Sequence, residues 1–316
     1  MRETRTETHM RPIRIAAQLH PQQGTWPALR AAVLRAEDLG YDIAYTWDHF
    51  SPLYGDPEGA HLECWTTLAA WAEATSRIEI GPLVTCNSYR NPDLLADMAR
   101  TVDHVAGGRL ILGLGSGWFR RDYESYGYEF GTAGSRLRDL GEALPRIEAR
   151  LASLNPPPVR RLPVLIAGRG VRRTTRLVAR HADAWHAEFP ERPDELEPAV
   201  AALRGWCDEI GRDPASIEWS VGIEPDDLDR FLAGDAATYL DMGFTQFTLG
   251  FNGPAWDVDT GTAFLAWRDE RNAARLAPAH ERERRAPLAA APESNGPGVA
   301  AGAVHGARER RKARAP

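Results

Sequence analysis

The stretch Trp26–Trp47, WPALRAAVLRAEDLGYDIAYTW, holds a helical pattern that is followed at once by a strand pattern. Apolar residues recur at three- and four-residue spacing from Leu29 to Leu39, which is typical of an amphipathic helix. Gly40 then ends the predicted helix, because glycine readily adopts the left-handed conformation of a C-terminal cap. The apolar run Ile43–Trp47 follows as a short strand. If such units recur, they predict a parallel sheet.

The same alternation recurs along most of the chain. The predicted strands are Ile13–Leu19, Ile43–Trp47, Ile78–Thr85, Leu110–Leu114, Val164–Ala167, Ala184–His186, Ile217–Val221 and Gln246–Gly250. The predicted helices are Trp26–Leu39, Trp65–Ala74, Leu94–Val105, Leu137–Leu154, Thr174–Arg180, Glu195–Ile210, Leu228–Met242 and Thr262–Asn272. Eight units in roughly 260 residues match the (β/α)8 barrel, and a doubly wound sheet is the main alternative. We therefore predict an α/β fold, a (β/α)8 TIM barrel, over residues 12–275.

The two ends of the chain differ from this pattern. Residues 1–11 are polar, and we expect a flexible N-terminus. Residues 276–316 are rich in Ala, Pro, Gly and Arg, with Leu288 as almost the only large apolar side chain. Such a composition buries too little surface to offset the entropy lost on ordering, so it predicts a disordered C-terminal tail.

Composition and charge exclude several classes of protein. The 316 residues include 43% hydrophobic and 26% charged residues with a formal net charge of −6, so no basic field attracts nucleic acid or an anionic membrane. No stretch approaches the roughly 18 apolar residues of a membrane span, and the polar N-terminus lacks the apolar core of a signal peptide. The three scattered cysteines and the histidine spacing favour neither disulfides nor a metal site. We expect a cytoplasmic protein that binds a small molecule.

In a parallel barrel the chemistry lies at the carboxyl ends of the strands. Asp48 and His49 follow the second predicted strand, and they put a hydrogen-bond acceptor and a titratable imidazole at the barrel mouth. A capping Asp beside a histidine bonded to the backbone is the alternative, and the strand-end position favours a functional role. Thr85 and Asn87 end the third strand, where small and amide side chains let a flat ligand approach. A simple turn before the next helix also explains them.

A glycine-rich loop follows the fourth strand. Gly113–Trp118, GLGSGW, has Trp118 where the dinucleotide-binding fingerprint needs its third glycine, and it belongs to the fourth unit of the chain. That interpretation therefore fails. Together with Asp122 and Tyr123, this loop could hold a phosphate or a ring, or its glycines could merely relieve crowding.

A second glycine-rich loop follows the fifth strand. Ala167–Gly170, AGRG, opens a predicted helix, and the free N–H groups at such a helix start suit a phosphate. Arg169 could add a positive charge. A plain loop is the alternative.

Taken together, these segments resemble the bacterial luciferase-like superfamily, and most closely its coenzyme F420-dependent oxidoreductase branch. The segments that carry the resemblance are TWDHF (46–50), GPLVTCNSYRNP (81–92), GGRLILGLGSGWFRRDYESYG (107–127), PVLIAGRG (163–170) and RLVARHADAW (176–185). The resemblance covers about residues 13–274. It implies a TIM barrel, a homodimer, and F420 or alternatively FMN held in the barrel mouth.

The resemblance also implies roles for single residues. Asp48 and His49 match the motif that lies against the deazaflavin, with His49 as the proton-transfer group and Asp48 holding its tautomer or contacting the ring. Leu83 and Val84 fall where relatives place a non-prolyl cis peptide behind the ring. Gly168–Gly170 match the loop that takes the cofactor phosphate. The other cofactor-binding residues implied in this way are Thr85, Asn87, Gly115, Gly117, Trp118, Tyr123, Ala167 and Arg169.

Two departures from the family pattern bear on the substrate. Trp118 stands where the sugar-phosphate dehydrogenases of this branch carry a glutamate, which argues against that reaction. Only the short segment Asn155–Leu162 joins the fourth unit to the fifth strand, where relatives have a longer segment over the pocket. We therefore expect a site that is more open, altered in substrate or impaired.

The function predicted from these residues is an F420-dependent oxidoreductase that transfers a hydride between the deazaflavin and a small organic substrate. Two alternatives remain open. One is an FMN-dependent luciferase-like monooxygenase that uses O2 and reduced flavin from a partner flavin reductase. The other is a non-catalytic flavin- or deazaflavin-binding protein.

Overall fold

The computed structural model describes residues 11–285, with side chains up to residue 275. The chain divides into two units after Leu276, and the first unit holds the whole sheet. All neighbouring strands pair in parallel, in the order β3-β2-β1-β9-β8-β7-β6-β5-β4. The strands are β1 (Arg14–Leu19), β2 (Ile43–Thr46), β3 (Glu79–Pro82), β4 (Thr85–Cys86), β5 (Leu112–Gly115), β6 (Val164–Ala167), β7 (Ala184–His186), β8 (Glu218–Ile223) and β9 (Phe244–Phe251). The predicted α/β barrel is therefore confirmed.

The third predicted strand is divided into β3 and β4. The break falls at the peptide bond between Leu83 and Val84, which is cis as predicted. β3 and β4 stand at the two ends of the strand order and are consecutive in the chain, and a parallel bridge between Ile80 of β3 and Leu110, just before β5, crosses the same junction. The sheet therefore closes almost completely into a barrel.

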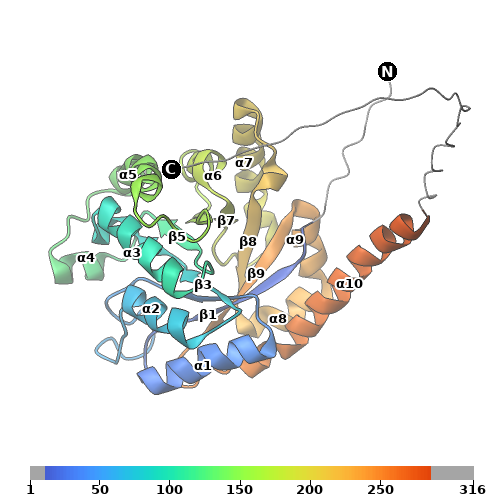
Figure 1. The fold of residues 1–316 in the computed structure, drawn as a ribbon, viewed down its shortest axis with the longest axis horizontal. Coiled ribbons are helices and arrows are strands. Elements are labelled where there is room, and N and C mark those ends of the chain that lie inside the picture. Colours follow the sequence, from blue (N-terminus) through green and yellow to red (C-terminus); the bar gives the residue numbers. More distant parts are fainter. Residues whose placement is uncertain (1–10, 286–316) are drawn as a thin grey trace, which may run out of the picture. The chain divides into compact units, whose positions relative to one another are not determined.

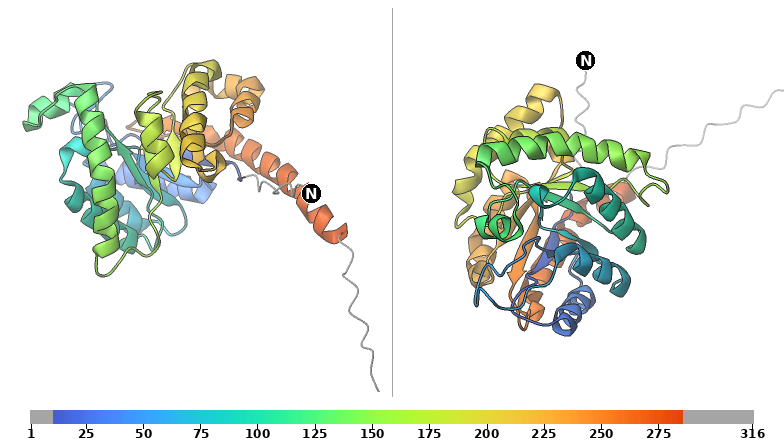
Figure 2. Two further views of the ribbon diagram at one scale, coloured as in Figure 1. Left: turned by 90° about the horizontal axis from the view of Figure 1, so that it is seen from above. Right: turned by 90° about the vertical axis from the view of Figure 1, so that its left-hand side faces the viewer.

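Helices surround the barrel (Figure 1, Figure 2). They are α1 (Trp26–Leu39), α2 (Cys64–Ala74), α3 (Pro92–Val105), α4 (Arg120–Tyr126), α5 (Ala133–Ser153), α6 (Thr174–His181), α7 (Glu197–Ile210), α8 (Leu228–Arg230), α9 (Ala236–Met242) and α10 (Thr262–Arg285). α1 packs on α2, α2 on α3 and α3 on α5, so successive units follow one another around the sheet. α4 is a short helix inside a segment expected to be a loop.

The local signals of the sequence explain α1. Leu29, Val33 and Ala36 are completely buried, and each fully buried Leu or Val contributes about 1.5–3 kcal/mol. Gly40 ends the helix with φ +88°, and its N–H donates to the carbonyl oxygens of Ala36 and Glu37. The periodicity and the glycine cap therefore give the observed bounds of this helix.

Two segments differ from the expectation. The predicted helix Leu228–Met242 is divided, because Phe231–Asp235 forms a π-helical turn between α8 and α9. α10 continues past the expected Asn272 into the segment expected to be disordered, and ends at Arg285. Arg11 donates hydrogen bonds to the carbonyl oxygens of Ala215 and Ser216. The rest of both predicted flexible ends, residues 1–10 and 286–316, lies outside the described residues.

Within the described part, no helix combines the length and the apolar character needed to cross a membrane.

An ion-pair cluster ties distant strands together at the amino-terminal end of the barrel. Arg14 on β1 donates to both carboxylate oxygens of Glu218 on β8, at 2.9 and 2.6 Å, and also pairs with Glu79 on β3. The side chain of Glu218 is only 10% exposed. The guanidinium of Arg14 therefore offsets two carboxylates that are largely removed from water.

Replacing Arg14 with methionine should lower the free energy of unfolding by roughly 2–4 kcal/mol, because it leaves a buried carboxylate without its partner. Urea denaturation checks this value. The control is Arg35→Ala, which removes an ion pair with Asp259 whose two side chains are each 51% exposed. That change should cost less than about 1 kcal/mol. Equal losses in the two variants would contradict the role given to Arg14.

Candidate functional site

A cavity of about 640 Å³ opens at the carboxyl ends of the strands. Its volume is within the range of about 300–1,000 Å³ that is usual for ligand pockets. The predicted residues that line it are Asp48, His49, Leu83, Val84, Gly115, Gly117, Trp118 and Ala167. Its other lining residues include Gln18, His20, Trp47, Leu53, Tyr54, Cys86, Tyr89, His186, Glu188, Phe189, Glu224 and Asn252. The carboxyl ends of the strands, or the segments that follow them, therefore converge on one place.

The carboxylate of Asp122, which comes from a different β/α unit of the barrel, holds His49 at this cavity. Its Nδ1 lies 2.8 Å from Oδ2 of Asp122 on α4, and its side chain is only 13% exposed. Aromatic rings surround the imidazole edge-on, with centroid distances of 5.8 Å to Trp47, 5.8 Å to Trp118 and 5.5 Å to Phe119. The ring orientation is thus fixed by packing and by one strong hydrogen bond.

Asp48 has a different environment. Its carboxylate accepts two hydrogen bonds from the guanidinium of Arg90, at 2.5 and 2.9 Å, and one from the backbone N–H of Cys86 at 3.1 Å. Arg90 also donates to Glu63 at 2.8 Å. Asp48 therefore joins the segment after β2 to the segment after β4. Of the two roles expected for it, it does not hold the tautomer of His49, because its carboxylate is bonded to Arg90 and to the N–H of Cys86.

Asp122 was expected to help hold a phosphate or a ring, and the structure places it behind His49 instead. It is completely buried and also accepts a hydrogen bond from the hydroxyl of Tyr89 at 3.2 Å. Burial alone would raise the pKa of this carboxyl, but hydrogen bonds from His49, the N–H of Phe50 and Tyr89 hold it below its usual value. Asp122 is therefore a carboxylate at neutral pH.

Two further histidines line the cavity, and the sequence analysis missed both. Nδ1 of His20 lies 2.8 Å from Oδ1 of Asn252, and its ring stacks on Trp47 at 4.0 Å. Nδ1 of His186 lies 2.9 Å from Oγ of Ser220. Burial lowers the pKa of His20 to about 4 and that of His186 to about 3, so both are neutral hydrogen-bonding groups. Because each histidine stands at the carboxyl end of a strand, the strand-end rule applied to β1 and β7 would have found them.

The cis peptide forms part of the cavity wall. The side-chain amide of Gln18 donates to the carbonyl oxygen of Leu83 at 2.8 Å, and the N–H of Leu83 donates to Thr46 at 2.7 Å. Val84 packs against Gly115, where an added Cβ would approach Val84 to 2.6 Å. This part of the wall is therefore formed by backbone and small side chains.

The remaining predicted residues lie around the cavity without lining it. Thr85 is buried in β4 and accepts a hydrogen bond from the indole of Trp65 at 3.0 Å. Tyr123 supports the glycine loop from behind, with its hydroxyl 3.3 Å from Sγ of Cys86. Asn87 is buried and faces a neighbouring surface hollow.

The loop Gly168–Gly170 precedes α6 next to the lining residue Ala167. Gly168 has φ +123°, a conformation that favours glycine. Arg169 already pairs with Glu195 at 2.9 Å and Glu188 at 3.6 Å. A phosphate at this loop would therefore depend mainly on backbone N–H groups.

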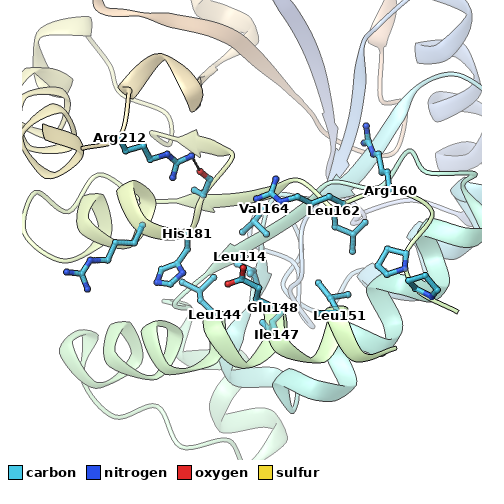
Figure 3. Close-up of a pocket in the computed structure, with 16 residues that line it drawn as sticks. Leu114, Leu144, Ile147, Glu148, Leu151, Arg160, Leu162, Val164, His181 and Arg212 are labelled. Atoms are coloured by element: carbon cyan, nitrogen blue, oxygen red, sulfur yellow. Dashed lines mark hydrogen bonds between the residues drawn. The ribbon is translucent and has the colours of Figure 1, made fainter. Parts of the chain in front are cut away.

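A second cavity, of about 660 Å³, lies between α5, β6 and α6 (Figure 3). Leu144, Ile147 and Leu151 of α5 project toward Leu162 and Val164 across it (Figure 3). It contains none of the predicted site residues, and it lies beside the strands instead of at their carboxyl ends. The cavity at the barrel mouth is therefore the candidate active site.

Comparison with known proteins agrees with this placement. The profile of the luciferase-like monooxygenase family matches residues 8–225. The phthiodiolone/phenolphthiodiolone dimycocerosates ketoreductase of Mycobacterium tuberculosis is 30% identical over 272 residues, covering 73% of this chain and 69% of the relative. An F420-dependent secondary alcohol dehydrogenase in complex with an F420-acetone adduct has a TM-score of 0.68 at 19% identity, covering 80% of this chain and 96% of that one. Riboflavin lyase RcaE with modified FMN and riboflavin has a TM-score of 0.57 at 12% identity, covering 73% and 67%.

The fold is a parallel α/β barrel with a cavity at the carboxyl ends of its strands. The chain belongs to the luciferase-like monooxygenase family, whose profile matches more than half of it. The predicted luciferase-like family and the predicted oxidoreductase/monooxygenase class are therefore confirmed. The two solved structures are less than 20% identical to this chain, and they support the fold alone.

Replacing Gly117 with alanine should destabilise the protein by roughly 2–4 kcal/mol, since it combines backbone strain with overpacking. Gly117 has φ +82°, and an added Cβ would lie 2.0 Å from the hydroxyl of Tyr123 and 2.6 Å from Sγ of Cys86. The control is Gly127→Ala, where φ is +71° and a Cβ meets nothing within 4 Å. This control should lose only about 1–2 kcal/mol. Urea denaturation measures the free energy of unfolding of both variants. A larger loss of stability in Gly127→Ala than in Gly117→Ala would refute the prediction.

Acidification should destabilise the protein from about pH 6.5 downward. The unfolded chain protonates its histidines near pH 6.5, whereas burial keeps His186 and His20 neutral in the folded chain down to about pH 3 and 4. The unfolded state thus binds more protons, so each histidine lowers the free energy of unfolding by about 1.4 kcal/mol per pH unit in this window.

Urea denaturation at several pH values measures this slope. His186→Gln should flatten it, and the exposed His104→Gln should keep the slope of the native chain. A slope for His186→Gln parallel to that of the native chain would show that His186 does not remain neutral in the folded state.

Proposed function

We propose that this chain is an F420-dependent oxidoreductase that transfers a hydride between the deazaflavin and a small organic substrate carrying a hydroxyl or carbonyl group. The observation that carries the proposal is the position of His49 at the cavity. Asp122 engages Nδ1 at 2.8 Å, and no described residue bonds Nε2. An oriented imidazole with one free nitrogen is the usual group for proton transfer near neutral pH.

The residues around the cavity fit a flat tricyclic coenzyme. Gly115 and Gly117 line it without side chains, and the cis peptide of Leu83 and Val84 lines it with backbone. His20 and His186 offer neutral hydrogen-bonding atoms to the edge of a ring. The loop Gly168–Gly170 adjoins the cavity and suits the coenzyme phosphate.

In this proposal the chain supplies orientation and proton transfer. When bound, the deazaflavin supplies the carbon that gives or takes the hydride. Nε2 of His49 takes the proton from the substrate oxygen in alcohol oxidation and returns it in carbonyl reduction. Trp47, Trp118 and Phe119 exclude water around the imidazole, which strengthens its electrostatic contacts.

The relatives support the substrate class. By their names, the ketoreductase acts on a ketone and the secondary alcohol dehydrogenase acts on an alcohol. A second candidate function is an FMN-dependent monooxygenase, which the family description and the modified FMN of riboflavin lyase favour. The flavin reductase partner, the homodimer and the cytoplasmic location remain predictions.

A binding titration with F420 and FMN side by side tests the proposal. Tighter binding of F420, followed by anaerobic reduction or oxidation of F420 with an alcohol or ketone, would support it. Tighter binding of FMN with oxygen consumption would support the monooxygenase. Binding without turnover over a substrate panel would identify a non-catalytic protein, and binding of neither compound would overturn all three.

Replacing His49 with alanine should lower turnover about 10²–10⁴-fold, because it removes the proton-transfer group. Coenzyme affinity should stay within about threefold, since the backbone wall and the phosphate loop are unchanged. Steady-state kinetics and a fluorescence titration measure the two effects. His104→Ala, on the exposed face of α3, is the control and should match the native chain. Unchanged turnover in His49→Ala would exclude the assigned role.

A further inference from the structure

Asp122 is a buried carboxylate that touches His49 but lines no part of the cavity. Oδ2 lies 2.8 Å from Nδ1 of His49 and accepts a hydrogen bond from the hydroxyl of Tyr89 at 3.2 Å. Oδ1 is buried and has no hydrogen-bond partner among the described residues. The imidazole is therefore the principal charged or chargeable partner of this carboxylate.

An ionised carboxylate can only accept hydrogen bonds. A contact of 2.8 Å between Asp122 and Nδ1 therefore requires the proton of the neutral imidazole to lie on Nδ1. Nε2 then carries a lone pair and is the nitrogen left for a ligand. When Nε2 gains a proton, the same carboxylate stabilises the imidazolium.

The other groups described around His49 do not compete with Asp122 as the charged partner of the imidazole. Asp48 is bonded to Arg90. His61 accepts a hydrogen bond from the indole of Trp47 at 3.3 Å, and burial lowers its pKa to about 4, so it is neutral. The other contacts of His49 are the edges of Trp47, Trp118 and Phe119, which carry no charge.

We propose that Asp122 is a positioning residue that fixes the tautomer and the ring orientation of His49, so that Nε2 is the atom that exchanges the proton with the substrate. The role rests on the proposed function, because His49 is the proton-transfer group only in that reaction. Tyr89 donates to the same oxygen of Asp122 as the imidazole does, and its own contribution is smaller because its loss leaves the bond to Nδ1 intact.

The test compares Asp122→Asn with the native chain by two independent readouts. The first is ¹⁵N NMR of the imidazoles, with the signals of His49 identified by their absence in His49→Gln. The native chain should carry the proton of His49 on Nδ1, and Asp122→Asn should lose this preference because an amide can also donate to Nδ1. This readout needs no coenzyme and no turnover.

The second readout is steady-state kinetics over a range of pH. Asp122→Asn should lower kcat about 10- to 1,000-fold, with KM and coenzyme affinity within about threefold. The pH profile of turnover should also change, since the carboxylate that stabilises the imidazolium is lost. Tyr89→Phe should change kcat less than Asp122→Asn does, and Asp139→Asn on the exposed surface of α5 should match the native chain.

The outcomes separate this inference from the proposed function. A folded Asp122→Asn that keeps the native tautomer would overturn the positioning role, whatever its kinetics. A lower kcat with an unchanged pH profile would also overturn it and would leave Asp122 as structural support. If His49→Ala keeps full turnover, the proposed function fails, whereas a changed tautomer in Asp122→Asn would still support the contact that fixes the imidazole.

Discussion

The strands of the barrel run in one direction, so their carboxyl ends meet at one rim. His20 after β1, His49 after β2 and His186 at the end of β7 face a common cavity for this reason alone. The closure depends on the two edge strands, β3 and β4, which are parts of one predicted strand divided at the cis peptide. The bridge between Ile80 of β3 and Leu110, just before β5, adds a backbone link across the same junction. The site therefore depends on how the sheet closes more than on any single motif.

Closure also buries charges near the barrel mouth, where Asp48 and Asp122 have separate partners. Asp48 is paired with the guanidinium of Arg90, whereas Asp122 is hydrogen-bonded to the imidazole of His49. A buried carboxylate without such a partner would be strongly destabilising. Arg90 pairs with Asp48 and Glu63, so its guanidinium belongs to the first of these two pairings. The cavity thus presents one histidine with a carboxylate behind it and two histidines that remain neutral.

Local signals were enough to predict the barrel. The bounds of α1, β6 and β7 agree with the expectation, because apolar periodicity, glycine caps and short apolar runs are properties of neighbouring residues. The segment RRDYESY of α4 lacks an apolar stripe, so it was expected to be a loop. The contact between His49 and Asp122 could not be predicted, because it joins residues 73 positions apart through the placement of that unpredicted helix. The sequence analysis gave the role of holding the His49 tautomer to Asp48, because Asp48 is next to His49 in the sequence.

The short segment Asn155–Leu162 bears on the shape of the site in an unexpected way. It was expected to leave the pocket at the barrel mouth more open, yet Pro157, Pro158 and Leu162 line the cavity beside α5. The mouth is bounded instead by single aromatic side chains, among them Trp118 at 64% and Tyr54 at 58% exposure. Two large apolar rings at the rim of a cavity gain free energy when a ligand covers them. Contacts of this kind can orient a substrate without a covering segment of chain, so the short segment does not by itself imply an impaired site.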